Sequence, residues 1–175
     1  MTSPASESGA LEFRIRDAVA ADAPTIVAFN AAMAWETERK QLDSRVLTAG
    51  VAAALADPDR LRYWVAETRD DPRVIGQAAV TREWSDWRHG WIWWLQSVYV
   101  AEDARRRGVF CALHRAIRDD ALARPDVIGL RLYVEVENHT AQATYRRLGM
   151  SPGGYHVYEE IWAERFNRAA SDVLG

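Results

Sequence analysis

Cysteine is almost absent from this sequence. The chain of 175 residues has one, Cys111, so no disulfide can form within it and no multi-cysteine metal site exists. Long hydrophobic runs are also missing. The longest apolar stretches, residues 91–95 and 51–56, are far shorter than the roughly 20 residues that cross a bilayer. Residues 1–10 lack the basic start and apolar core of a secretory signal. We therefore expect a cytoplasmic protein without a metal.

Neither sign of charge is in large excess. There are 22 lysines and arginines against 25 aspartates and glutamates, a formal charge of -3, which gives no general attraction to nucleic acid or to a membrane. Any binding of anions must therefore be local. The apolar fraction of 49% is that of an ordinary globular chain. We expect a flexible tail over residues 1–10, a single domain over 11–161, and a C-terminal tail over 162–175 whose composition allows a helix.

Hydrophobic periodicity predicts a mixed α/β chain with no repeats. The expected strands cover residues 13–16, 63–68, 74–81, 91–100, 127–136 and 154–161. The expected helices begin at 22–24 and 43–44 and cover 106–124 and 140–148. The middle strands form an antiparallel meander, and the helix over 106–124 crosses over between two strands that run parallel.

Tryptophan is unusually frequent, and five of the eight lie between Trp84 and Trp94. Such a cluster builds either a wall of the core or an aromatic pocket. We expect Trp91, Trp93 and Trp94 to pack under the helices. For Trp84 and Trp87, which lie near a turn, both alternatives stay open.

The most informative segment joins the strand ending at Val100 to a helix through Arg105, two further arginines and Gly108. The first turn of a helix has unpaired N–H groups and the positive end of the helix dipole, so it binds phosphate readily. The segment has neither the Gly-Lys-Ser/Thr ending of a nucleotide-binding P-loop nor the three glycines of a dinucleotide site. The alternative is a solvated basic patch.

Two motifs here resemble those of the GNAT superfamily of N-acetyltransferases. Arg105-x-x-Gly108-x-Phe110 is similar to its Gln/Arg-x-x-Gly-x-Gly/Ala motif, although Phe110 replaces a small residue. The segments 138–141, Tyr145 and 148–150 are similar to its Asn-x-x-Ala-x-x-x-Tyr-x-x-Leu-Gly-Phe pattern. The resemblance implies a mixed sheet of about six to seven strands, about four helices, and acetyl-coenzyme A as cosubstrate.

The resemblance also implies roles for individual residues. Main-chain groups of Val98 and Val100 would contact the pantetheine arm, and an N–H near Val98 could stabilise the oxyanion. Tyr145 would protonate the departing thiolate as a general acid. The implied cofactor-binding residues are Val98, Tyr99, Val100, Arg105, Arg106, Arg107, Gly108, Val109, Phe110, Cys111, Asn138 and Tyr145. Asn138 could instead be only a helix cap, and Tyr145 only a packing residue.

The proton of the attacking amine must go to a carboxylate or to a water. The candidate carboxylates are Glu83, Glu135, Asp86 and Glu36, and the first two are favoured. Acidic and aromatic side chains suit a cationic amine, so we expect the acceptor to meet Met33, Glu36, Trp84 and Asp86.

The predicted activity is acetylation of a small primary amine by direct attack. The alternatives are acetylation of protein lysines or amino termini, and a non-catalytic sensor of acyl-coenzyme A. Many such domains pair as homodimers, so a homodimer is a further expectation.

Overall fold

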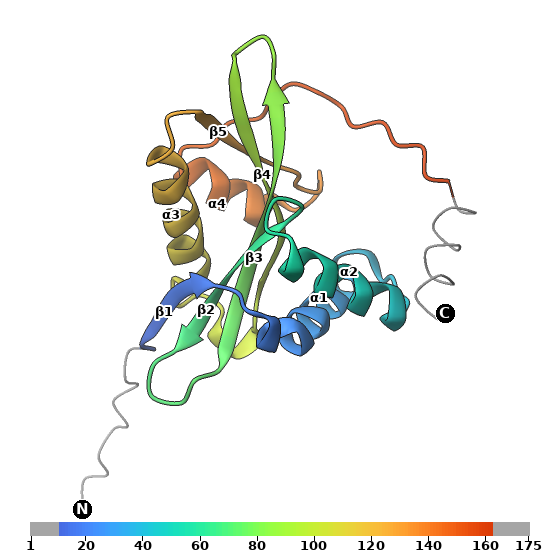
Figure 1. Ribbon diagram of the computed structural model, residues 1–175, viewed down its shortest axis with the longest axis vertical. Helices are drawn as coiled ribbons and strands as arrows, with labels where there is room; N and C mark the ends of the chain where they lie inside the picture. Colours follow the sequence, from blue (N-terminus) through green and yellow to red (C-terminus); the bar gives the residue numbers. More distant parts are fainter. Residues whose placement is uncertain (1–10, 163–175) are drawn as a thin grey trace, which may run out of the picture.

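A five-stranded mixed sheet forms the centre of the molecule (Figure 1). The computed structural model describes residues 11–162. The strands lie in chain order: β1 (Phe13–Asp17), β2 (Arg62–Thr68), β3 (Val74–Ser85), β4 (Gly90–Val100) and β5 (Val127–Leu132). The first four are antiparallel neighbours, and β4 and β5 run parallel. The predicted mixed α/β architecture is confirmed.

Helices cover both faces of the sheet. Helices α1 (Ala23–Glu38) and α2 (Ser44–Ala56) pack on one face, and α3 (Val109–Leu122) packs on the other (Figure 1). Helix α4 (His139–Arg147) follows β5, and short 3₁₀ turns lie at Ala20–Asp22 and Glu102–Ala104. Helix α2 begins where the sequence predicts, because the Asp43 carboxylate accepts hydrogen bonds from the first free amides.

Alternating side chains of β3 build two separate cores. Ala78 is buried against α3, together with Leu113 and Trp93, whereas Ala79 is buried against α1 and α2. Gly76 allows α3 to approach the sheet: a Cβ at this position would lie 2.9 Å from Cγ1 of Val109. The start of α3, which carries the basic turn, is therefore held firmly against the sheet.

The tryptophans divide between core and surface. Trp93 is buried beneath α3 and Trp91 packs at the margin of that core, as predicted. Trp94 instead stacks on Tyr133, with ring centroids 4.3 Å apart. Trp84 and Trp87, near the β3–β4 turn, are 45% and 88% exposed, so they form neither core nor an enclosed pocket.

The sequence-based prediction is wrong at three places. Residues 154–161 do not form a strand, so the described sheet has five strands rather than six or seven. Their alternating pattern favours an extended chain, and the chain is extended (Figure 1), but no strand lies beside it. Strand β5 ends at Leu132 rather than at residue 136. Helix α3 begins at Val109 rather than at 106, because Arg106 and Gly108 have positive φ angles of 60° and 81°.

The predicted tail over residues 1–10, and the predicted C-terminal tail over 162–175 except for Trp162, lie outside the described residues. Within residues 11–162, none of the helices is long and apolar enough to cross a membrane.

Candidate active site

Strands β4 and β5 part halfway along β4. The last paired residues are Leu95 of β4 and Leu132 of β5. Strand β4 continues to Val100, which still pairs with Gly76 on its other side. Residues 96–100 therefore have no partner strand on the β5 side within the described chain. Their main-chain groups on that edge can bind a ligand.

A bulge redirects the main chain within this unpaired stretch. Gln96 and Tyr99 keep partners in β3, but Ser97 and Val98 have none, and Ser97 has a positive φ of 49°. A bulge of this kind turns the backbone groups of a strand away from the regular ladder.

A buried chain of polar side chains holds the bulge in place. Nε2 of Gln77, which is fully buried, donates to the carbonyl oxygen of Ser97 at 3.1 Å and to Oδ1 of Asn30 at 2.6 Å. Asn30 in turn donates to the Tyr63 hydroxyl. The sequence reasoning missed Gln77 and Asn30. The available signal was a glutamine in the middle of an otherwise apolar strand.

The basic turn presents unpaired amides. In the helix that follows, Ala112 is the first residue whose N–H has a main-chain acceptor, the Gly108 carbonyl at 3.0 Å. Within residues 11–162, the amides of residues 106–111 donate no hydrogen bond of normal length. No atom lies within 4 Å of a Cβ built on Gly108, so the approach to these amides is open. Free amides at a helix start bind phosphate groups.

The three arginines of the turn have different roles. Arg105 is used internally: its guanidinium donates to the Val100 carbonyl at 3.0 Å and to Glu36 at 2.7 Å. Arg106 and Arg107 are exposed and form no ion pair with another described residue. Of the three arginines, Arg106 and Arg107 therefore remain available to an anionic ligand.

Glu36 links α1 to this end of β4. Its carboxylate accepts hydrogen bonds from the Tyr99 hydroxyl at 2.8 Å and from Arg105. Burial opposes ionisation, but these hydrogen bonds outweigh it, and the pKa of Glu36 lies below its usual value. Glu36 therefore stays ionised and holds the side chains of Tyr99 and Arg105 against α1. Met33, one turn earlier on α1, is half-buried.

Tyr145 lies next to the basic turn. Its ring meets the ring of Phe110 edge to face, with centroids 5.7 Å apart. Within the described chain its hydroxyl has no hydrogen-bond partner. Burial raises the pKa of Tyr145, so the phenol keeps its proton at neutral pH. Phe110, the departure from the family motif, is the residue that packs against Tyr145.

Asn138 caps α4. Its Oδ1 accepts a hydrogen bond from the Ala141 amide at 3.0 Å. The capping alternative is therefore realised for the side-chain oxygen, while the side-chain amide nitrogen donates to no acceptor among the described residues.

The two favoured carboxylates, Glu83 and Glu135, differ in how many of their oxygens accept hydrogen bonds. Both oxygens of Glu83 are engaged, one by Arg131 at 2.9 Å and the other by Nε1 of Trp94 at 2.5 Å. Glu135 uses one oxygen to accept the Glu137 amide, and its other oxygen is free among the described residues. Of the two, Glu135 is the one with a carboxylate oxygen that has no partner among the described residues.

Trp84 and Asp86 lie far from the basic turn. Trp84 pairs with Trp91 at the hairpin end of β4. Trp91 comes nine residues before Val100, which corresponds to about 30 Å along a strand. The structure brings Glu36 to the turn, but it does not bring Trp84 and Asp86 there. Contact of Trp84 and Asp86 with the acceptor stays a prediction, and it requires an acceptor long enough to reach them from the basic turn.

No group of three or more histidine, cysteine, aspartate or glutamate side chains in the described part of the chain could hold a metal ion.

Known proteins with this fold include several acetyltransferases. The model of the acetyltransferase (GNAT) family matches residues 25–150. A structure from Clostridium difficile 630, described as "a possible acetyltransferase", is 43% identical, with a TM-score of 0.79 over 86% of this chain and 98% of that one. A search of curated proteins gave no match.

Two more distant structures share the fold. A Trypanosoma brucei acetyltransferase is 15% identical, with a TM-score of 0.66 over 86% of this chain and all of that one. A glucosamine-6-phosphate N-acetyltransferase from Arabidopsis thaliana is 16% identical, with a TM-score of 0.66 over 85% and 97%. The family match covers most of the chain and includes the strand, the basic turn and Tyr145. This chain belongs to the GNAT acetyltransferase family and is an acyltransferase.

Proposed function

We propose that this protein transfers the acetyl group of acetyl-coenzyme A to the primary amine of a small molecule. The observation that carries the proposal is the row of unpaired amides at residues 106–111, with Tyr145 in ring contact with Phe110 of the same row. A diphosphate on these amides, with Arg106 and Arg107 beside it, leaves the pantetheine arm to follow the unpaired edge of β4.

Each protein group then has a defined task. The amine nitrogen attacks the thioester carbonyl carbon, and the main-chain N–H at Val98, in the bulge, stabilises the oxyanion. As the carbon–sulfur bond breaks, the Tyr145 hydroxyl gives its proton to the sulfur. The unpaired hydroxyl and the raised pKa of Tyr145 support this role, because the proton is present throughout the neutral range.

We propose Glu135, directly or through a water, as the acceptor of the amine proton. Its free oxygen supports the assignment, whereas Glu83 is engaged on both oxygens. Glu83→Gln is therefore expected to leave kcat at pH 7 close to the wild-type value. Glu135→Gln is expected to lower kcat at pH 7.

We infer that the acceptor is a cationic amine, because the ionised carboxylate of Glu36 and the side chain of Met33 lie on the same helix at this end of β4. The name of the Arabidopsis structure indicates that one protein of this fold acetylates an amino sugar. Acetylation of protein lysines or amino termini, and acyl-coenzyme A sensing without turnover, are the competing functions. A cytoplasmic location stays a prediction.

A screen of amines, polyamines, amino sugars, amino acids and peptides tests the proposal, with coenzyme A release as the readout. Turnover with a small amine and none with peptides is the expected result. Turnover with peptides alone would favour the protein acetyltransferase. Binding of acetyl-coenzyme A without turnover on any acceptor would favour the sensor.

A further inference from the structure

A row of three aromatic rings joins α3 to α4. The ring of Phe110 contacts the ring of His114, with centroids 6.2 Å apart, and the ring of Tyr145, with centroids 5.7 Å apart. Phe110 and His114 are four residues apart on α3, so they share one face of that helix. The planes of Phe110 and Tyr145 meet at 77°, an edge-to-face arrangement in which aromatic rings attract each other.

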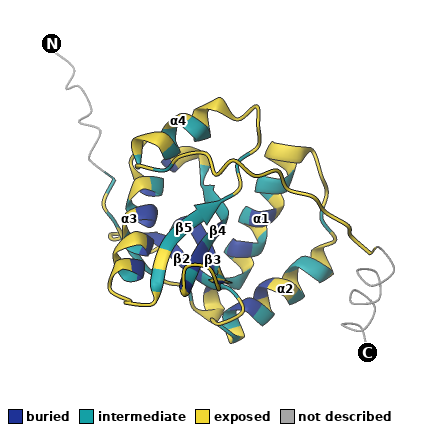
Figure 2. Cartoon of the chain, turned by 90° about the horizontal axis from the view of Figure 1, so that it is seen from above, coloured by how far each residue is buried: buried dark blue, intermediate teal, exposed yellow. Residues whose placement is uncertain are grey.

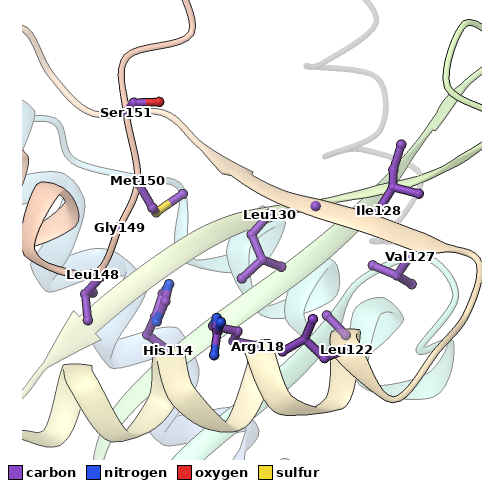
Figure 3. Close-up of a pocket in the computed structure, with 12 residues that line it drawn as sticks. His114, Arg118, Leu122, Val127, Ile128, Leu130, Leu148, Gly149, Met150 and Ser151 are labelled. Atoms are coloured by element: carbon purple, nitrogen blue, oxygen red, sulfur yellow. The ribbon is translucent and has the colours of Figure 1, made fainter.

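The inner end of this row is fixed within the molecule. His114 is 4% exposed, and burial lowers its pKa, so the imidazole is uncharged at neutral pH. Figure 3 shows its ring pointing from α3 toward Leu148 and Met150, which lie just after α4. Val109, the neighbour of Phe110 in the chain, is buried in the core between α3 and the sheet. The Phe110 ring therefore has a firm support.

Tyr145, at the outer end of the row, lies on a helix with less support. Helix α4 has nine residues and none of them is buried, and Figure 2 shows it at the outside of the molecule. Within the described chain, the Tyr145 hydroxyl has no hydrogen-bond partner, and its ring contacts no aromatic ring other than that of Phe110. Of the described contacts, the one with Phe110 is therefore the one that orients the Tyr145 ring.

We propose that Phe110 is a positioning residue for Tyr145. The inference rests on the proposed function, in which the Tyr145 hydroxyl protonates the leaving sulfur. Because Phe110 belongs to the row of amides at residues 106–111, its ring also sets the distance from Tyr145 to the proposed phosphate site. A general acid must lie within hydrogen-bond reach of the atom that it protonates, and a displacement of about 1 Å can cost roughly 100-fold in rate. A small residue at position 110, as in the family motif, would leave Tyr145 without this contact.

A double-mutant cycle tests whether Phe110 acts through the Tyr145 hydroxyl. Phe110→Ala should lower kcat about tenfold for an amine found in the acceptor screen, and should change the dissociation constant of acetyl-coenzyme A by less than about threefold. In a Tyr145→Phe background the same substitution should lower kcat by less than about twofold, because the hydroxyl that it positions is already absent. Leu122→Ala, at an apolar residue of α3 that is 66% exposed, is the matched control and should leave kcat unchanged.

The cycle separates failure of this inference from failure of the proposed function. Equal losses of kcat in both backgrounds would mean that Phe110 shapes the basic turn or the fold and does not act through Tyr145. An unchanged kcat in Phe110→Ala would overturn the positioning role directly. A wild-type kcat in Tyr145→Phe alone would instead remove the proposed acid, and the role of Phe110 would fall with it.

A second readout does not depend on turnover. The protein is labelled with 3-fluorotyrosine, and the fluorine NMR signal of Tyr145, identified by its absence from Tyr145→Phe, is followed as the pH is raised. Burial raises the pKa of Tyr145, so Phe110→Ala should move the titration midpoint down toward that of Tyr158, which is 93% exposed. Circular dichroism checks that the variant is folded. An unmoved midpoint in folded Phe110→Ala would show that Phe110 does not cover Tyr145, and would refute the proposal.

Discussion

At the scale of single residues, the surroundings of Tyr145 support its proposed role as a proton donor. Its ring is packed against Phe110, but its hydroxyl is unpaired among the described groups. A partly buried phenol with no acceptor loses hydration without compensation. That cost is explained if the hydroxyl meets the sulfur of the cosubstrate.

Tyr145→Phe should therefore lower kcat about 100-fold or more, because a general acid contributes roughly 10²–10⁴ in rate. The dissociation constant of acetyl-coenzyme A should change by less than about threefold, since the ring is kept. Steady-state kinetics and calorimetry measure the two quantities. Tyr158→Phe, at a tyrosine that is 93% exposed, is the matched control and should match the wild type. An unchanged kcat in Tyr145→Phe would exclude it as the acid.

Gln77 is the second residue on which the site depends. Its Nε2 is the donor for both Ser97 O and Asn30 Oδ1. Gln77→Leu should destabilise the fold by about 1–3 kcal/mol, because two acceptors lose their donor in the interior. Urea denaturation measures this loss. A Gln77→Leu protein as stable as the wild type would mean that the hydrogen bonds of Gln77 do not hold the bulge.

At the scale of elements, β1 and β2 are joined by an ionic network at the edge of the sheet far from β5. Glu67 accepts from Arg14 and Arg16, each at 2.6 Å, and Arg16 also pairs with Asp22 at 2.7 Å. The hydrogen bonds from Arg16, then those from Arg14, lower the pKa of Glu67 to about 2.

This shift predicts a loss of stability in acid. The pKa of Glu67 is lower in the folded than in the unfolded chain, so its contribution is complete above the unfolded value near 4.5. It is lost as the pH falls from there through about 2. Urea denaturation between pH 6 and pH 2.5 should show the wild type losing more stability than Glu67→Gln. Parallel pH dependences of the two proteins would contradict this account.

How much the sequence predicts differs between elements. The helix starts at Asp43 and Asn138 follow from local capping chemistry, and the turn at Gly108 follows from its motif. The end of β5 cannot be predicted from local sequence, because it depends on where strand β4 diverges from β5. The absence of a strand over residues 154–161 was equally hidden, since a strand requires a neighbour that no local pattern reveals.

In the candidate site, too, features set by local motifs were predictable and features set by tertiary contacts were not. The amides of residues 106–111 and the position of Tyr145 were predictable because the motifs are local in sequence. The link from Arg105 to Glu36 joins residues 69 apart in the chain, so a basic run alone could not show that only two arginines stay available. The buried contact between Gln77 and Ser97 was likewise a matter of tertiary packing.

At the scale of the whole molecule, the two halves of β4 have different tasks. Its first half is paired on both sides and builds the core beneath α3. Within the part of the chain that the structure describes, its second half is paired on one side only, and it ends at the basic turn. The sheet thus provides a rigid frame and, at one place, an unpaired main-chain edge, where we propose that the cosubstrate binds.

Calorimetric titration with acetyl-coenzyme A of the wild type, Gly108→Ala and Gly108→Glu tests this arrangement most directly. Gly108 has a φ of 81° and open space around it, so Gly108→Ala measures the backbone strain alone. Gly108→Glu adds a negative charge where the diphosphate should sit. We predict tight binding by the wild type, moderately weaker binding by Gly108→Ala, and no detectable binding by a folded Gly108→Glu. Equal affinity in Gly108→Glu and the wild type would show that the phosphates bind elsewhere.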